Sequence, residues 1–417
     1  MKLGLLTFHS VCNFGANLQA LSTVSWLRAQ GHEVKIIDWS PHRDLALYRG
    51  VPDSQKKAHD DFCRRHYDLT PPCRDDRDVA RTIEEHRLEG VVIGSDALFQ
   101  YVPWRTAWIP NRHGRIRGFH LMPDQRWPNP FLGTFLDQMK CPVPVAYLAI
   151  SAQNADYRRM SRIECRRFRR HYERFAMITV RDTWTQGLFE RIFRGDTPPP
   201  VVPDPVFGLN QNYMQAHPQE VRQRFSLPDN YVLVTFHQGS AYATRWLNEF
   251  QVECEHHGYT CLSLPLPQNT HVRFSDPNAN LPLPMSPEEW FSLLAGAQGY
   301  VGINMHPIVT CLHNAVPFFS FDYYGLFSGR KKRGGLVTSK VFDLLNRAGL
   351  LDYYHSVRKP QWPSPANVFQ RLMSFDRSRC RALAGLRHRE YRAAMCRLVR
   401  RLAADEEPAD APSLTTE

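Results

Sequence analysis

Three residues able to bind anions or move protons each follow a predicted strand. Asp96 comes after the apolar run 91–93, Arg181 follows residues 176–180, and His306 follows residues 300–303. A histidine or carboxylate in hydrogen-bond reach can deliver or remove a proton, and a guanidinium binds carboxylate or phosphate oxygens in pairs. Ligands of open parallel sheets bind at the carboxyl ends of strands, which is where these residues are expected.

A structural interpretation stays open for each of them. Arg181 could form a surface ion pair with its neighbour Asp182. His306 could be a histidine satisfied at the start of a helix, and Asp96 could cap the turn that follows it. With 43 arginines in the chain, position is what favours a binding role for Arg181.

The N-terminal loop is a second candidate region. Residues 3–8 form an apolar run of strand length, and residues 16–30 repeat leucine and valine at helical spacing up to a terminating glycine. His9 and Asn13 follow the strand and are expected to face a cleft. Gly15 allows close backbone approach, and a helix start offers unpaired N–H groups to anions. An ordinary strand-to-helix turn explains the same pattern, since no recognised phosphate-loop motif is present.

Strands and helices alternate along most of the chain. A further strand at 33–39 completes a βαβ unit, the signature of a parallel sheet. The apolar run 143–150 predicts another strand of the same set. A second alternating set, with predicted strands at 231–236, 260–264, 300–303 and 317–321, begins beyond the proline-rich segment 196–205. We therefore predict an α/β fold with two Rossmann-like domains facing a cleft. The predicted parts are an N-terminal domain (1–200), a C-terminal domain (201–355), an arginine-rich helical segment (356–402) and a disordered acidic tail (403–417).

Composition excludes several classes of protein. Hydrophobic residues make up 43% of 417, enough for a sizeable core, so a wholly disordered chain is excluded. No apolar stretch approaches the ~20 residues of a membrane span, and the N-terminal apolar run is too short for a signal peptide. The ten cysteines are scattered, which disfavours a disulfide framework or a zinc site. We expect a cytoplasmic protein without a metal.

The net charge of +11 rests largely on arginine. Residues 158–174 hold eight arginines together with an apolar stripe at helical spacing, which predicts one helix with a buried face and a cationic face. That cationic face suits anionic lipid or a diphosphate-linked substrate, and a merely solvated face is an equal alternative. The basic loop 329–335 could close over anionic ligands or be plain surface. The role of the tryptophan-rich region 99–140 stays open.

Several motifs occur in an order that resembles one enzyme family. The first block is the most specific, and the resemblance spans about residues 1–355. Its elements are Thr7-Phe8-His9, Asn13-Phe14-Gly15-Ala16, Leu18-Gln19, Ile36-Ile37-Asp38, Gly94-Ser95-Asp96, Val180-Arg181-Asp182, Asp204-Pro205, Met305-His306 and the segment from Ser339-Lys340 to Leu350. In this respect the chain resembles the polysaccharide pyruvyl transferases.

The resemblance implies a fold similar to the two-lobed glycosyltransferase-B architecture. It implies transfer of a pyruvyl group from phosphoenolpyruvate, as donor substrate, to hydroxyls of a sugar in a polysaccharide or lipid-linked precursor, with release of phosphate. No cofactor or metal is implied, and no nucleic-acid partner is expected. The residues it suggests as catalytic are His306, Asp96 and Arg181. Those it suggests for substrate binding are His9, Asn13, Gly15, Gln19, Ser95 and Lys340.

Alternatives remain at this point. A nucleotide-sugar glycosyltransferase would have the same outline, and Asp322 after a predicted strand could then bind ribose. A non-enzymatic protein could use the arginine faces on an anionic membrane, at its inner surface, or on nucleic acid. Pro307 after His306, and Asn304-Met305 before it, depart from the pattern of the family.

Overall fold

The structure of the chain is a computed structural model. It describes residues 1–107, 121–153, 155–213, 216–239, 241–323, 339–357, 359 and 361–403. The basic loop 329–335, Trp108 and nearly all of the predicted acidic tail lie outside the described residues.

The N-terminal domain is built on a parallel five-stranded sheet in the order β2-β1-β3-β4-β5. Each strand pairs in parallel with its neighbours. The order reverses direction between β1 and β3, and the crevice at such a switch point is where ligands of open sheets bind. The strands are β1 (Lys2–Leu6), β2 (Glu33–Ile36), β3 (Gly90–Asp96), β4 (Val145–Ile150) and β5 (Met177–Val180).

The C-terminal domain repeats this arrangement in the order β10-β9-β8-β6-β7. Its pairs are also parallel, and its order reverses between β6 and β8. The strands are β6 (Tyr231–Thr235), β7 (Thr260–Ser263), β8 (Gly299–Gly302), β9 (Phe318–Asp322) and β10 (Tyr354–Ser356). Two parallel α/β domains, as predicted, are thus confirmed.

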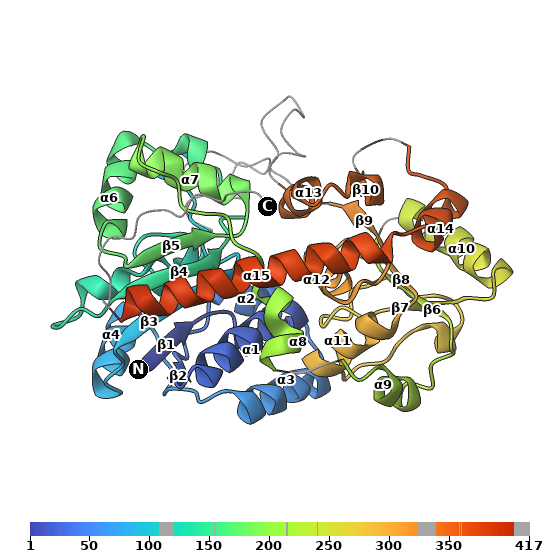
Figure 1. The fold of residues 1–417 in the computed structure, drawn as a ribbon, viewed down its shortest axis with the longest axis horizontal. Coiled ribbons are helices and arrows are strands. Elements are labelled where there is room, and N and C mark those ends of the chain that lie inside the picture. The colour runs from blue at the N-terminus through green and yellow to red at the C-terminus, as the bar shows by residue number, and fades with distance from the viewer. Residues whose placement is uncertain are drawn as a thin grey trace, which may run out of the picture.

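Helices cover both faces of each sheet (Figure 1). In the first sheet Leu5 packs toward α1 and Leu6 toward the opposite face with α4, α6 and α7, as the two-residue period of a strand requires. The described helices are α1 (Phe14–Ala29), α2 (His42–Leu47), α3 (Asp53–His66), α4 (Asp76–Glu85), α5 (Trp104–Ala107), α6 (Arg162–Tyr172), α7 (Thr183–Phe193), α8 (Leu209–Asn212), α9 (Pro218–Arg224), α10 (Ala241–His256), α11 (Pro287–Gly296), α12 (Met305–Asn314), α13 (Lys340–Arg347), α14 (Pro365–Met373) and α15 (Arg377–Leu402).

Helices α1 and α15 join the two domains. α1 begins at the cap Asn13, whose side-chain oxygen accepts from the backbone N–H of Ala16 at 3.1 Å. It is buried on nearly all sides, because it also contacts α11 of the second domain. α15 runs across both domains, packing on α12 at one end and on β4 and β5 toward the other (Figure 1). The cores of the two domains are therefore continuous, which fixes one sheet against the other.

Two further features are the state of the cysteines and the hydropathy of the helices. All ten cysteines are free, and eight are buried, as expected of reduced thiols. In the described part of the chain, no helix is both long enough and apolar enough to cross a bilayer.

Candidate active site

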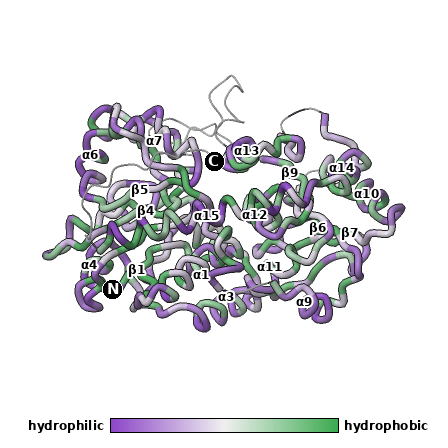
Figure 2. The backbone as a smooth tube through the Cα atoms, in the orientation of Figure 1, coloured by the Kyte–Doolittle hydropathy of each residue, from purple (hydrophilic) through white to green (hydrophobic). Residues whose placement is uncertain are grey.

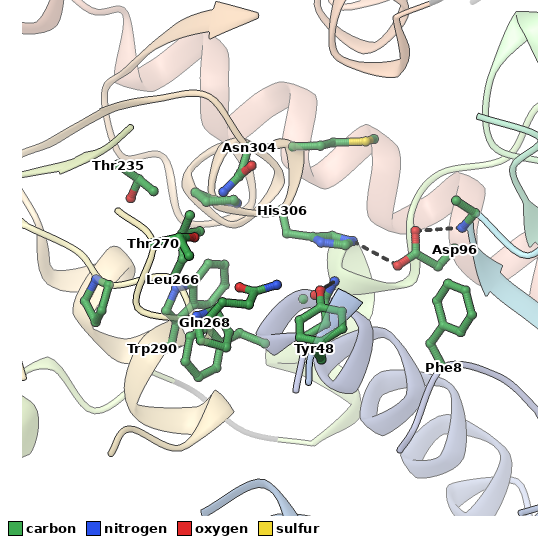
Figure 3. A pocket seen from close by; sticks show the side chains of 18 of the residues that line it. Phe8, Tyr48, Asp96, Thr235, Leu266, Gln268, Thr270, Trp290, Asn304 and His306 are labelled. Carbon is green, nitrogen blue, oxygen red and sulfur yellow. Dashed lines mark hydrogen bonds and ion pairs between the residues drawn. The ribbon is translucent and has the colours of Figure 1, made fainter. Parts of the chain in front are cut away.

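A cavity of about 500 Å³ lies where the switch points of the two sheets face each other. Phe8 after β1 and Asp96 at the end of β3 line one side. Thr235 at the end of β6 and His306 after β8 line the other. Figure 3 shows the His306 ring directed toward Asp96 across this space. Each domain therefore contributes the ends of the two strands between which its sheet reverses.

Asp96 is the centre of a charged cluster. Its Oδ1 is 2.9 Å from Nη2 of Arg181 and 3.9 Å from Nζ of Lys340, and its Oδ2 is 4.0 Å from Nε2 of His306. Its backbone has φ of +107°, which is uncommon for a residue other than glycine. Strained backbone of this kind concentrates at functional sites. Residues from both domains thus converge on one carboxylate.

Burial and charge set the protonation states of this cluster. Burial alone would raise the pKa of Asp96, but Lys340, Arg181 and His306 outweigh it and lower that pKa below its ordinary value. Burial lowers the pKa of His306, although Asp96 opposes the shift. Burial also lowers the pKa of Lys340. At neutral pH the cluster therefore holds an ionised carboxylate beside an imidazole that is mostly neutral.

Arg181 lies beneath the cavity rather than in its wall. Its side chain is 2% exposed, and its two terminal nitrogens bind Asp96 at 2.9 Å and Asp204 at 2.8 Å. Gln19 Nε2 donates to the same Asp204 oxygen at 2.5 Å. The guanidinium therefore positions Asp96, and two carboxylates already neutralise it. This placement does not favour the direct contact with a donor that the sequence suggested.

Gly15 and Asn13, both predicted, do line the cavity at the start of α1. A Cβ on Gly15 would lie 2.0 Å from Cγ of His306, so only glycine leaves room for the imidazole there. Asn13 Nδ2 donates to the hydroxyl of Tyr48 at 2.9 Å. The N-termini of α1 and α12 thus both face the cavity, and helix N-termini favour anions.

The other predicted residues divide between the cavity and the layer behind it. Lys340, at the start of α13, lines the cavity. His9 is buried and bonded through Nε2 to Asp38 at 2.9 Å. Gln19 is held by Asp204, as described above. The side chain of Ser95 is buried outside the lining, and its hydroxyl has no hydrogen-bond partner among the described residues.

Several lining residues were missed by sequence reasoning. His237 directly follows a strand that the sequence predicts, so the rule that ligands bind at strand ends could have found it. Gln268 and Thr270 follow the next strand at a greater distance, and no motif marks them. The missed polar and aromatic lining residues are Tyr48, Gln100, Gln153, Thr235, His237, Gln268, Thr270 and Trp290.

Among the described residues, no group of three or more His, Cys, Asp or Glu side chains is placed to hold a metal ion. Among the described residues that line the cavity, the acidic and basic side chains are instead one carboxylate, one lysine and two histidines: Asp96, Lys340, His237 and His306.

Comparison with known proteins gives a family and a set of folds. The family model for polysaccharide pyruvyl transferases matches residues 13–324. No curated protein matches the sequence. A glycosyltransferase from Streptomyces nogalater is similar over 97% of this chain and 100% of its own, at 14% identity and a TM-score of 0.46. A UDP-N-acetylglucosamine 2-epimerase from Rickettsia bellii is similar over 97% of each chain, at 10% identity and a TM-score of 0.49. Likenesses this remote say nothing about substrates.

Proposed function

The chain belongs to the polysaccharide pyruvyl transferase family, and we propose that it moves the pyruvyl group of phosphoenolpyruvate onto two hydroxyls of a sugar. The observation that carries the proposal is the convergence of Lys340 and His306 on Asp96, in a cavity faced by the N-termini of α1 and α12. Such a site offers a cation, a proton carrier and helix N–H groups to a small donor with two anionic groups.

The donor is assigned to the side of the cavity near Lys340 and α12. Phosphoenolpyruvate carries a carboxylate and a phosphate, each of which gains from an ammonium group or a helix N-terminus. Asn304, which caps α12, makes no side-chain hydrogen bond to that helix. Pro307, the third residue of α12, has no N–H, so we assign the backbone N–H groups of Met305 and His306 to a ligand oxygen.

Proton transfer is assigned to His306. Its Nε2 is buried 4.0 Å from Asp96, and Nδ1 lies beside Gly15 at the start of α1. We assign proton exchange with the substrate to Nδ1, where the absence of a side chain at residue 15 leaves room. Neutral imidazole takes the proton of the attacking hydroxyl, and the nearby carboxylate stabilises the imidazolium that forms. The imidazolium then donates this proton to the methylene carbon of the donor.

The overall reaction balances without a redox partner. Two sugar oxygens bond to the central carbon of the donor, and the bond from that carbon to the phosphate oxygen breaks. One of the two hydroxyl protons ends on the methylene carbon, which becomes a methyl group. The other leaves with inorganic phosphate, and the product is a cyclic pyruvate ketal on a polysaccharide or its lipid-linked precursor.

The main alternative is a nucleotide-sugar glycosyltransferase in which Asp322 binds the ribose. The position of Asp322 does not favour this role. Asp322 is 1% exposed, and its Oδ2 accepts from the hydroxyls of Ser339 at 2.5 Å and Tyr354 at 2.7 Å. It lies outside the cavity lining, so it is not placed to bind a ribose. A non-enzymatic role is likewise disfavoured by membership of a transferase family.

A comparison of thermal shifts tests the donor. A ligand that binds only the folded state stabilises it, by about 2.7 kcal/mol at a hundredfold excess over its Kd. We expect phosphoenolpyruvate to raise the Tm more than equimolar phosphate, UDP or GDP, and Lys340→Met to reduce that rise. Lys35→Met is the matched control, because Lys35 pairs with Asp68 and neither residue lines the cavity. A shift with UDP or GDP alone would contradict the proposal.

A further inference from the structure

Helix α6 presents a concentration of uncompensated positive charge. It lies at the outer edge of the N-terminal domain (Figure 1), and much of it is hydrophilic (Figure 2). Cys165, Phe168 and Tyr172 face the core, which leaves the opposite side to solvent. Four exposed arginines on that side form no ion pair with any described residue: Arg162, Arg166, Arg167 and Arg170.

The neighbouring arginines differ, because acidic residues neutralise them. The single helix predicted over residues 158–174 is wrong at its start, because Arg158 and Arg159 lie in a separate short turn before α6. Both pair with Asp156. Arg169 pairs with Glu173 at 2.8 Å. The unpaired charge is therefore gathered on the one face of α6 that points outward.

Two large apolar side chains are exposed near this charge. Ile163, on α6 itself, is 71% exposed, and Trp104 is 63% exposed, the two highest values among the large hydrophobic residues described. The backbone N–H of Trp104 donates to Glu164 Oε1 at 2.8 Å, which holds α5 beside the first turn of α6. Exposing such residues costs free energy in water, and they are typical anchors at a lipid–water interface.

A groove between α6 and α7 adds further cations. It has a volume of about 520 Å³, and Arg162, Arg191 and Arg194 line it with a single acidic residue, Glu190. Arg191 also donates to the carbonyl of Met160, which fixes its guanidinium at the edge of the groove. Guanidinium groups bind phosphate oxygens in pairs, so this groove suits a phosphate-bearing headgroup.

We propose that the outward face of α6, with the groove beside it, binds the surface of an anionic lipid bilayer. The unpaired arginines contact lipid phosphates, and Ile163 and Trp104 enter the interface between headgroups and acyl chains. The exposed apolar side chains favour a bilayer over nucleic acid, because Ile163 offers nothing to a phosphate backbone. Binding of this surface to lipid does not depend on catalysis. If the proposed function holds, such binding would bring the enzyme to a lipid-linked acceptor.

Vesicle sedimentation tests the proposal with the full chain. We expect binding to vesicles of phosphatidylcholine with about one-third phosphatidylglycerol, and none to pure phosphatidylcholine. Each arginine near an anionic surface contributes about a fivefold factor in affinity, so Arg166→Gln, Arg167→Gln and Arg170→Gln combined should weaken binding about a hundredfold. Ile163→Ser should weaken it several-fold further.

The controls separate this face from net charge. Exposed arginines on α15 also lack ion pairs among the described residues, so Arg389→Gln, Arg392→Gln and Arg397→Gln change the net charge equally. Leu386→Ser on α15 matches Ile163→Ser. Both controls should bind vesicles as the wild type does. Equal losses in the α6 and α15 variants, no binding to anionic vesicles, or tighter binding to duplex DNA than to vesicles would each overturn the proposal.

Discussion

His306 of the C-terminal domain occupies the space that a side chain at Gly15 of the N-terminal domain would need. A Cβ at residue 15 would lie 2.0 Å from Cγ and 2.2 Å from Nδ1 of the imidazole. The contact joins the first turn of α1 to the first turn of α12, and each helix begins at the end of a strand beside a switch point. The contact between Gly15 and His306 therefore belongs both to the domain interface and to the candidate active site.

Replacing Gly15 tests this contact. In Gly15→Ala the methyl group must displace the His306 ring, and a misplacement of about 1 Å can cost a hundredfold in rate. We expect kcat/KM for pyruvyl transfer to fall by about that factor. The matched control is Gly50→Ala, since Gly50 lines the same cavity but its Cβ would meet nothing within 4 Å. Equal activities of the two variants would show that the position of His306 does not matter.

The pH dependence tests the role of His306. Burial lowers its pKa from 6.5, so the neutral form that accepts a proton persists to lower pH than for a free histidine. Activity should fall only as the pH drops through that lowered pKa, which places the acid limb of kcat/KM below pH 6.5.

Two variants should move this limb in opposite directions. Asp96 raises the pKa of His306, so Asp96→Asn should shift the limb to lower pH. Lys340 lowers that pKa, so Lys340→Met should shift it to higher pH. The pH dependence of the residual kcat/KM of each variant is compared with that of the wild type. Shifts in the same direction, or none, would show that another group titrates.

Arg181 should act through stability and positioning. Breaking a buried ion pair by removing one partner typically costs about 3–5 kcal/mol, because the other charges stay buried. Arg181→Met leaves the buried carboxylates of Asp96 and Asp204 without their guanidinium partner. In urea denaturation, this substitution should therefore lower the free energy of unfolding by about that amount. The exposed pair of Arg245 with Glu249 is the control, and Arg245→Met should cost less than about 1 kcal/mol.

The alternative for Arg181 makes a different prediction. If it contacts the donor directly, Arg181→Met should weaken binding of phosphoenolpyruvate while the unfolding free energy stays near that of the wild type. Calorimetric titration with phosphoenolpyruvate alongside the denaturation curves separates the two roles.

Local patterns in the sequence predicted most of the fold but only part of the site. Apolar runs marked nine of the ten described strands, and the glycine after residue 30 marked the end of α1. The short edge strand β10 was missed, because the three residues Tyr354–Ser356 form no apolar run. Asp96, Arg181 and His306 could be predicted as site residues because each follows a predicted strand in the sequence.

The remaining site features depend on contacts between distant segments. No pattern near Arg181 reveals that Asp96 and Asp204 neutralise it, since these residues lie 85 and 23 positions away. Trp290 and Gln268 of the second domain line the same cavity as Asn13 and Tyr48 of the first domain, which requires the two domains to pack together. Such packing is set by complementary surfaces of whole domains, which no short motif encodes.

The most direct test of the account follows the pyruvyl group itself. The enzyme is incubated with phosphoenolpyruvate labelled with carbon-13 at the methylene carbon and with a panel of hexosides that have free hydroxyl pairs. We predict that the label appears as a ketal methyl group on one hexoside, with equimolar release of phosphate, and that His306→Gln abolishes both while retaining donor binding. Sugar transfer from a nucleotide sugar, with phosphoenolpyruvate unconsumed, would contradict it.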